Sequence, residues 1–107
     1  MEITGSIILK NIDWHLEKCE VGYFIDKSYK GKGIISKVLF IITDHCFHEL
    51  KLHKIFLRIA EDNFSNIHVA KENCFVKEGI LRQDFKVSEG KWIDVDYCGL
   101  INPCKNE

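Results

Sequence analysis

The sequence predicts an α/β domain built around a mixed β-sheet. Two observations carry this prediction. Strand-like segments flank a helix-like segment in the middle of the chain, which is the order of a βαβ unit. Near the end, the turn residues "SEGK" (88–91) separate two strand-like segments, which is the signal of a β-hairpin. Since 107 residues fit one domain and leave no room for two, we expect one domain over residues 1–107.

The first half of the chain contains two strands and the longer helix. Residues 6–12, "SIILKNI", are rich in β-branched residues, and residues 19–25, "CEVGYFI", alternate, with Cys19 and Val21 on one face and Glu20 on the other. A helix is expected over about residues 34–50. Its apolar residues recur at helical spacing, at Ile35, Val38, Leu39, Ile42 and Cys46.

The second half contains three strands and a shorter helix. Residues 54–60, "KIFLRIA", form the next strand, because they combine β-branched and aromatic residues without a breaker. A shorter helix is expected over about residues 65–73, and the hairpin strands over about 81–87 and 92–101. The two strands around the longer helix should be parallel with a right-handed crossover, and the outer pairs should be antiparallel.

Composition indicates a soluble globular protein, with 46% hydrophobic and 29% charged residues. A net charge of -1 gives no overall preference for nucleic acid. No apolar run is long enough to span a membrane, and no secretory signal opens the chain. The five cysteines are odd in number and lack a C-x-x-C pair, so we expect reduced thiols in a cytoplasmic protein.

A glycine-rich, lysine-rich turn, "SYKGKG" (28–33), lies between a predicted strand and the start of the longer helix. A helix N-terminus exposes unpaired N–H groups, and glycines let an anion approach them closely. A plain turn with solvated lysines remains open as an alternative. A Walker loop is disfavoured because neither Lys32 nor Lys91 is followed by Ser or Thr, and a dinucleotide fold because Ser36 replaces the third glycine.

Three stretches in the same order extend this observation: "YFIDKSYKGKGIISKVL", "KIFLRIAEDNFSN" and "AKENCFVKEGILRQDF". Together they resemble the GNAT superfamily of acetyl-CoA-dependent N-acetyltransferases, most closely the RimJ/RimL-like branch. The resemblance covers about residues 5–101. It implies the GNAT fold, acetyl-CoA as co-substrate and an amine as acceptor, without a metal.

The resemblance also assigns residues to the binding of acetyl-CoA. The backbone around Ile25 would pair with the pantetheine arm, and the side chain of Asn63 would contact that arm. The pyrophosphate would lie against the turn that begins the longer helix. This turn comprises Lys30, Gly31, Lys32, Gly33, Ile34, Ile35 and Ser36. Ile35 replaces a small residue of the family pattern, which crowds the helix start.

For catalysis, the resemblance implies a carboxylate that deprotonates the acceptor amine and a donor near the thiol sulfur. Glu20 matches the family base, with an ordinary solvated carboxylate as the alternative. The tyrosine that serves as acid in some relatives is replaced by Ala70. The serine of the RimJ/RimL-like branch falls on Asn66, with Ser65 as a fallback, and an acidic residue such as Asp94 would face the acceptor.

Two further patterns concern structure more than catalysis. Cys74 occupies the family's glycine position after the shorter helix, and Asn73 is the better candidate for the left-handed residue there. His45 and His48 have the spacing of metal ligands on a helix, but no third ligand follows, so we favour a solvated helix face over zinc.

The family begins with a strand and two helices before the segment that matches "ITGSIILKNI" (3–12). The resemblance therefore implies that this chain lacks them, which would leave one sheet face uncovered. We expect a homodimer or larger assembly to cover it. Two functions stand: an N-acetyltransferase for a protein N-terminus, a peptide or a small amine, or a truncated acyl-CoA-binding or structural remnant without turnover.

Overall fold

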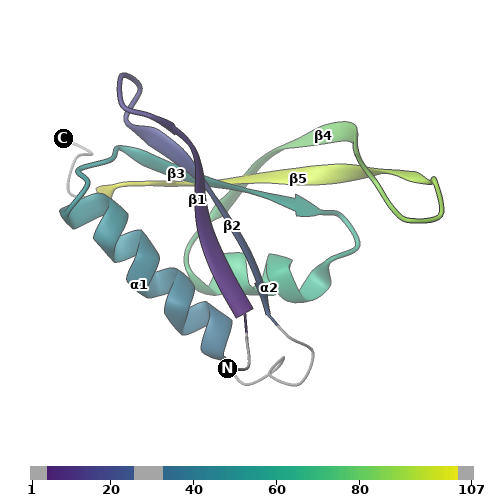
Figure 1. The fold of residues 1–107 in the computed structure, drawn as a ribbon, viewed down its shortest axis with the longest axis horizontal. Coiled ribbons are helices and arrows are strands. Elements are labelled where there is room, and N and C mark those ends of the chain that lie inside the picture. The colour runs from purple at the N-terminus through teal and green to yellow at the C-terminus, as the bar shows by residue number, and fades with distance from the viewer. Residues whose placement is uncertain (1–4, 26–32, 104–107) are drawn as a thin grey trace.

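The computed structural model describes residues 5–25 and 33–103. They form a five-stranded sheet with two helices in the expected order (Figure 1). The strands follow the spatial order β1-β2-β3-β5-β4. The elements are β1 (Gly5–Asp13), β2 (Lys18–Ile25), α1 (Ile34–His48), β3 (Lys54–Ala60), α2 (Phe64–Glu72), β4 (Val76–Lys86) and β5 (Trp92–Ile101).

The predicted pairing of the strands is confirmed. β2 and β3 are parallel, whereas β1 with β2 and β4 with β5 are antiparallel. β3 also pairs with β5, antiparallel. The largest difference in bounds is in β4, which begins at Val76 rather than near residue 81. Almost every residue of this edge strand is exposed, so its first half lacks the alternation that marks a half-buried strand.

The parallel pair is short, and this shapes the molecule. β2 and β3 pair only from Lys18 opposite Lys54 to Glu20 opposite Phe56. Beyond that point β2 continues to Ile25 and β3 to Ala60, and Figure 1 shows the two strands leading away from each other. We call this opening the β2–β3 split.

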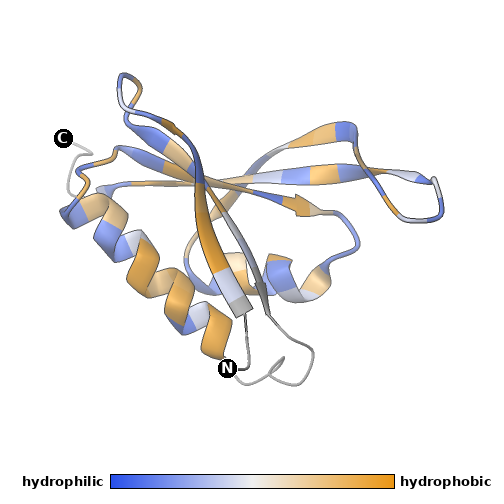
Figure 2. Ribbon diagram, in the orientation of Figure 1, coloured by the Kyte–Doolittle hydropathy of each residue, from blue (hydrophilic) through white to orange (hydrophobic). Residues whose placement is uncertain are grey.

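Both helices contribute to one hydrophobic core on one face of the sheet. Alternate residues of β3 (Ile55, Leu57 and Ile59) are buried in this core with Leu39 of α1 and Val69 of α2. Figure 2 shows hydrophobic and hydrophilic residues alternating along β3 and sharing α1 between them. Neither α1 nor α2, the helices of the described residues, has the length and hydrophobicity that crossing a bilayer requires.

The opposite face of the sheet, which we call the open face, carries side chains that neither helix covers. Phe56 and Tyr97 stack there, with ring centroids 4.9 Å apart. The sheet register places Ile8, Val76 and Ile101 on this face, and their side chains are 56%, 63% and 45% exposed. The open face is therefore apolar at several points where a single chain leaves it in water.

The end of α2 differs from expectation. The left-handed residue is Cys74, with a φ of 67°, and the prediction of Asn73, whose φ is -98°, was wrong. The side chain of Asn73 explains the difference, because its Nδ2 donates to the backbone oxygen and the hydroxyl of Ser36 and to the carbonyl of Val69. Asn73 thus ties α2 to the first turns of α1, and the chain turns one residue later.

Candidate active site

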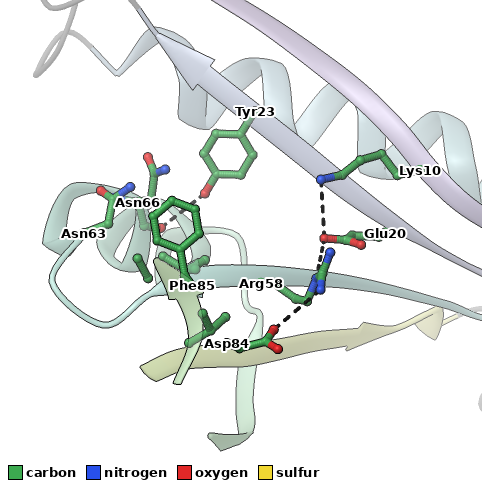
Figure 3. A pocket seen from close by; sticks show the side chains of 11 residues that line it. Lys10, Glu20, Tyr23, Arg58, Asn63, Asn66, Asp84 and Phe85 are labelled. Carbon is green, nitrogen blue, oxygen red and sulfur yellow. Dashed lines mark hydrogen bonds and ion pairs between the residues drawn. The ribbon is translucent and has the colours of Figure 1, made fainter. Parts of the chain in front are cut away.

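A cavity of about 370 Å³ lies where β2 and β3 separate (Figure 3). Three residues singled out from the sequence line it: Glu20 from β2, Asn63 from the end of the β3–α2 loop, and Asn66 from α2. The split therefore brings together side chains that lie far apart in the chain. Further lining residues come from β1, β3 and β4, and sequence reasoning did not identify them.

Glu20 is buried and fully engaged. Its side chain is 3% exposed, its Oε1 accepts a hydrogen bond from Asn11 Nδ2 at 2.9 Å, and its Oε2 accepts one from Arg58 Nε at 2.9 Å. Lys10 Nζ lies 3.6 Å from the same Oε2. The alternative that Glu20 is an ordinary solvated carboxylate is therefore wrong.

These partners determine the pKa of Glu20. Burial by itself would raise the pKa of the carboxyl group, but the hydrogen bond and charge of Arg58 oppose it. With the hydrogen bond from Asn11 and the charge of Lys10, they hold the pKa below its ordinary value. Glu20 is therefore ionised throughout the neutral range.

Arg58 connects the buried carboxylate to an exposed one. Its Nη1 lies 3.6 Å from Oδ2 of Asp84, whose side chain is 41% exposed and lines the same cavity. The hydrogen bond to Glu20 raises the pKa of Arg58 further, so the guanidinium keeps its charge. Lys10, Glu20, Arg58 and Asp84 form a chain of alternating charges, which we call the charge network (Figure 3).

Two bulges in edge strands supply members of this site. In β1 the register shifts between Lys10 and Asp13, and Asn11, with a φ of 51°, reaches Glu20. In β4 the register shifts between Leu81 and Phe85, around Gln83 with a φ of 49°. Bulges redirect side chains, and here they turn polar groups of both edge strands toward the split.

Asn63 and Asn66 stand at the start of α2. Asn63 Oδ1 accepts hydrogen bonds from the backbone N–H of Asn66 and from the hydroxyl of Ser65, which caps the helix. The hydroxyl of Tyr23 donates to the backbone oxygen of Asn66 at 3.2 Å. Within the described residues, the side-chain N–H₂ groups of Asn63 and Asn66 donate to no other residue. Both are therefore able to donate to a ligand in the cavity.

The residues predicted to bind a phosphate lie elsewhere. Gly33 is the N-cap of α1 with a φ of 72°, and α1 has no side-chain cap. Ile35 packs against the hydrophobic core, so it does not crowd the helix start as expected, and Ser36 is held by Asn73. Lys30, Gly31 and Lys32 lie outside the described residues, and Ile25 ends β2. Figure 1 shows the start of α1 and the end of β2 at the same end of the fold.

Some residues of the site had weak signals in the sequence. Arg58 is a charge within an otherwise apolar strand, which indicates a paired group, but its partner Glu20 lies 38 residues away. Asp94 does not line the cavity, and its Oδ1 instead accepts the backbone N–H of Gln83 in the β4 bulge. The described residues contain no group of three metal-ligating side chains.

Replacing Glu20 with glutamine is expected to destabilise the fold by about 1–3 kcal/mol near neutral pH. Because the folded pKa lies below the ordinary value, the carboxylate stabilises the fold above its unfolded pKa, near 4.5. This contribution is lost as the pH falls through the folded pKa. Urea unfolding from about pH 7 down to about pH 3 should therefore show a deficit that shrinks in acid. A deficit that stays constant with pH would contradict the assignment.

Comparison with known proteins identifies related sequences. The profile described as "Acetyltransferase (GNAT) domain" matches residues 2–76. The chain is 38% identical over 88 residues to "Probable N-acetyltransferase YjcK" of Bacillus subtilis (strain 168), and the match covers 82% of this chain and 48% of that protein. The chain spans about half the length of the curated relatives it matches.

Solved structures show the same arrangement. A ribosomal-protein-S5-alanine acetyltransferase from Vibrio fischeri superposes with a TM-score of 0.89 at 29% identity, over 95% of this chain and 56% of that one. A dodecameric structure of spermidine N-acetyltransferase from Vibrio cholerae gives a TM-score of 0.86 at 29% identity, over 94% of this chain and 58% of that one.

Proposed function

The chain belongs to the GNAT acetyltransferase family, and on this premise we propose that it is an N-acetyltransferase. In this proposal it moves an acetyl group from acetyl-CoA to a primary amine, which a protein N-terminus, a peptide or a small amine would supply. The observation that carries the proposal is the cavity in the β2–β3 split, which gathers Glu20, Asn63 and Asn66.

Three features of the described residues favour acetyl-CoA as the co-substrate. Beyond Glu20, the edge of β2 that faces β3 has no strand partner there, so its peptide groups can pair with the amides of a pantetheine arm. The first N–H groups of α1 have no side-chain cap and can bind a pyrophosphate. Asn63 retains its N–H₂ group as a donor. The residues therefore fit the molecule.

The binding residues of the proposal follow from these features. The backbone around Ile25 and the side chain of Asn63 would hold the pantetheine arm. The turn at the start of α1 would hold the pyrophosphate. That turn comprises Lys30, Gly31, Lys32, Gly33, Ile34, Ile35 and Ser36.

Acetyl-CoA supplies a thioester whose carbonyl carbon bonds to the amine nitrogen while its bond to sulfur breaks. In the proposal, Glu20 accepts the proton of the amine and Asn66 donates a hydrogen bond near the sulfur. The lowered pKa makes Glu20 a weak base that returns a proton readily to water. Its bond to Arg58 adds a second role, because the ionised carboxylate fixes the guanidinium at the cavity.

A thiol-release assay with acetyl-CoA and a panel of amines and peptides tests this function. The expected result is release of free CoA that depends on both the amine and the protein. Isothermal titration with acetyl-CoA is the companion measurement. Binding of acetyl-CoA without release of thiol for any acceptor would contradict the N-acetyltransferase and favour a binding module.

The proposal extends to assembly and location. Residues 1–107 act as one domain, and the uncovered open face supports a homo-oligomer. A cytoplasmic location is supported by the odd number of cysteines, of which Cys19, Cys46 and Cys98 are buried as free thiols.

We expect the protein to be a homodimer or larger at micromolar concentration. Burial of apolar surface recovers roughly 25 cal/mol per Å², and a standard interface covers about 800 Å² per partner. Replacing both Ile8 and Val76 with lysine on the open face should shift the mass measured by light scattering toward the monomer. Leu16→Lys in the β1–β2 turn adds a charge outside this face and should leave the mass unchanged. A folded wild-type monomer would contradict the prediction.

A further inference from the structure

The two carboxylates of the charge network have unlike surroundings. Both oxygens of Glu20 accept hydrogen bonds, and water scarcely reaches them. Asp84 makes no hydrogen bond with any described residue and has one ion pair, to Arg58 at 3.6 Å. Its side chain is well exposed and lines the cavity. Asp84 is therefore the carboxylate of the network that a ligand can reach.

The bulge in β4 is what presents Asp84 to the cavity. In a regular strand successive side chains point to opposite faces, yet the neighbours Asp84 and Phe85 both line the cavity. Leu81 pairs with Val95 and Phe85 with Ile93, so β4 advances four positions (81 to 85) where β5 advances two (95 to 93). The extra residues turn the strand and bring both side chains to the same side.

The bulge is held by a specific contact. Gln83 adopts a φ of 49°, which a residue with a side chain takes up only at some cost, and its backbone N–H donates to Asp94 Oδ1 at 2.9 Å. This bond crosses from β4 to β5 and fixes the position of Asp84 and Phe85. A strained backbone that surrounding contacts maintain is a feature typical of functional sites.

We propose that Asp84 and Phe85 form the subsite that binds the acceptor amine. This inference rests on the proposed function and adds the residues that hold the acceptor. The carboxylate of Asp84 pairs with the ammonium of a primary amine, and the exposed ring of Phe85 contacts the carbon stem that carries it. Arg58 stays bound to Glu20 on its other side, which leaves the oxygens of Asp84 able to accept the ammonium.

The subsite is consistent with the position of the remaining groups. Asn63 and Asn66 lie on the α2 side of the cavity, and Asp84 and Phe85 lie on the β4 side (Figure 3). An acceptor held by Asp84 would therefore face the side of the cavity where Asn63 is proposed to hold the pantetheine arm. The amine and the thioester would enter from different elements of the fold.

The test uses n-butylamine as the probe with the full chain. Asp84→Asn should raise the KM for n-butylamine about tenfold, because it removes a charge-assisted contact at a partly exposed site. The affinity for acetyl-CoA, measured by isothermal titration, should stay unchanged. Asp84→Glu should recover part of the loss. Glu89→Gln, which removes a carboxylate from the exposed turn of the same hairpin, should leave both values unchanged.

A direct binding measurement separates this inference from the proposed function. The side-chain carboxyl ¹³C signal of Asp84 should shift when n-butylamine is titrated into the wild type, and the Asp84→Asn variant should bind the amine more weakly. Amine binding that depends on Asp84, without any thiol release, would contradict the proposed function alone. An unchanged KM in Asp84→Asn, or an Asp84 signal that does not respond to the amine, would overturn the subsite.

Discussion

Replacing Gly33 with glutamate is expected to weaken acetyl-CoA binding at least about a hundredfold. Gly33 is the N-cap of α1, and the first N–H groups of this helix carry roughly half a positive charge at a site proposed to bind the pyrophosphate. A carboxylate at this position would occupy those donors and repel the phosphates. A hundredfold change corresponds to about 2.7 kcal/mol, which charge repulsion and loss of the anion site together can supply. Isothermal titration with acetyl-CoA measures the effect.

Two control variants separate the charge from the backbone strain at Gly33. Gly33→Ala introduces a side chain at a φ of 72°, where no atom lies within 4 Å of the new Cβ, so it adds strain without charge. Gly90→Glu adds the same carboxylate at a φ of 82° in the β4–β5 turn, away from α1. Gly33→Ala should reduce the affinity less than Gly33→Glu, and Gly90→Glu should leave it unchanged. Full affinity in folded Gly33→Glu would refute the assignment of the phosphate site.

Replacing Arg58 with methionine is expected to destabilise the fold by about 3 kcal/mol. The variant keeps the aliphatic volume of the side chain but removes the guanidinium, so Glu20 remains buried with a charge that only Lys10 and Asn11 offset. An uncompensated buried charge costs far more than the loss of a surface ion pair. Urea unfolding near neutral pH, with the slope compared between variants, measures the difference.

The double variant Glu20→Gln with Arg58→Met decides whether this loss comes from the buried charge. Once Glu20 is neutral, removal of Arg58 leaves no unpaired carboxylate, so the double variant should be more stable than Arg58→Met alone. Arg82→Met removes the other arginine of the chain, which is exposed on β4, and should change stability by less than about 0.5 kcal/mol. Additive effects of the two substitutions would show that Glu20 and Arg58 do not act as a pair.

The position of Gly33 and the central βαβ unit could be read from the sequence because both depend on local chemistry. Apolar spacing over a few residues distinguished α1 from its flanking strands, and a glycine was placed where the backbone adopts a positive φ. The order of the family motifs added the fold and the identity of the site residues Glu20, Asn63 and Asn66, which line one cavity.

The beginning of β4 and the left-handed residue after α2 were not predictable in the same way. β4 is an edge strand with little burial, so its first half has no apolar alternation to detect. The choice between Asn73 and Cys74 depended on Ser36, which lies 37 residues away and engages the side chain of Asn73. In both cases the deciding contact is absent from any short window of the sequence.

The sequence by itself thus determined the family, the order of the elements and the helix start at Gly33, because spacing and glycine chemistry act over a few residues. Only the tertiary structure decided the state of the site. The burial of Glu20 and its bond to Arg58 arise from the pairing of β2 with β3, and Asp84 reaches the cavity through a bulge fixed by Asp94 of the neighbouring strand. Such contacts join residues whose proximity is set by sheet register, and register depends on the whole fold.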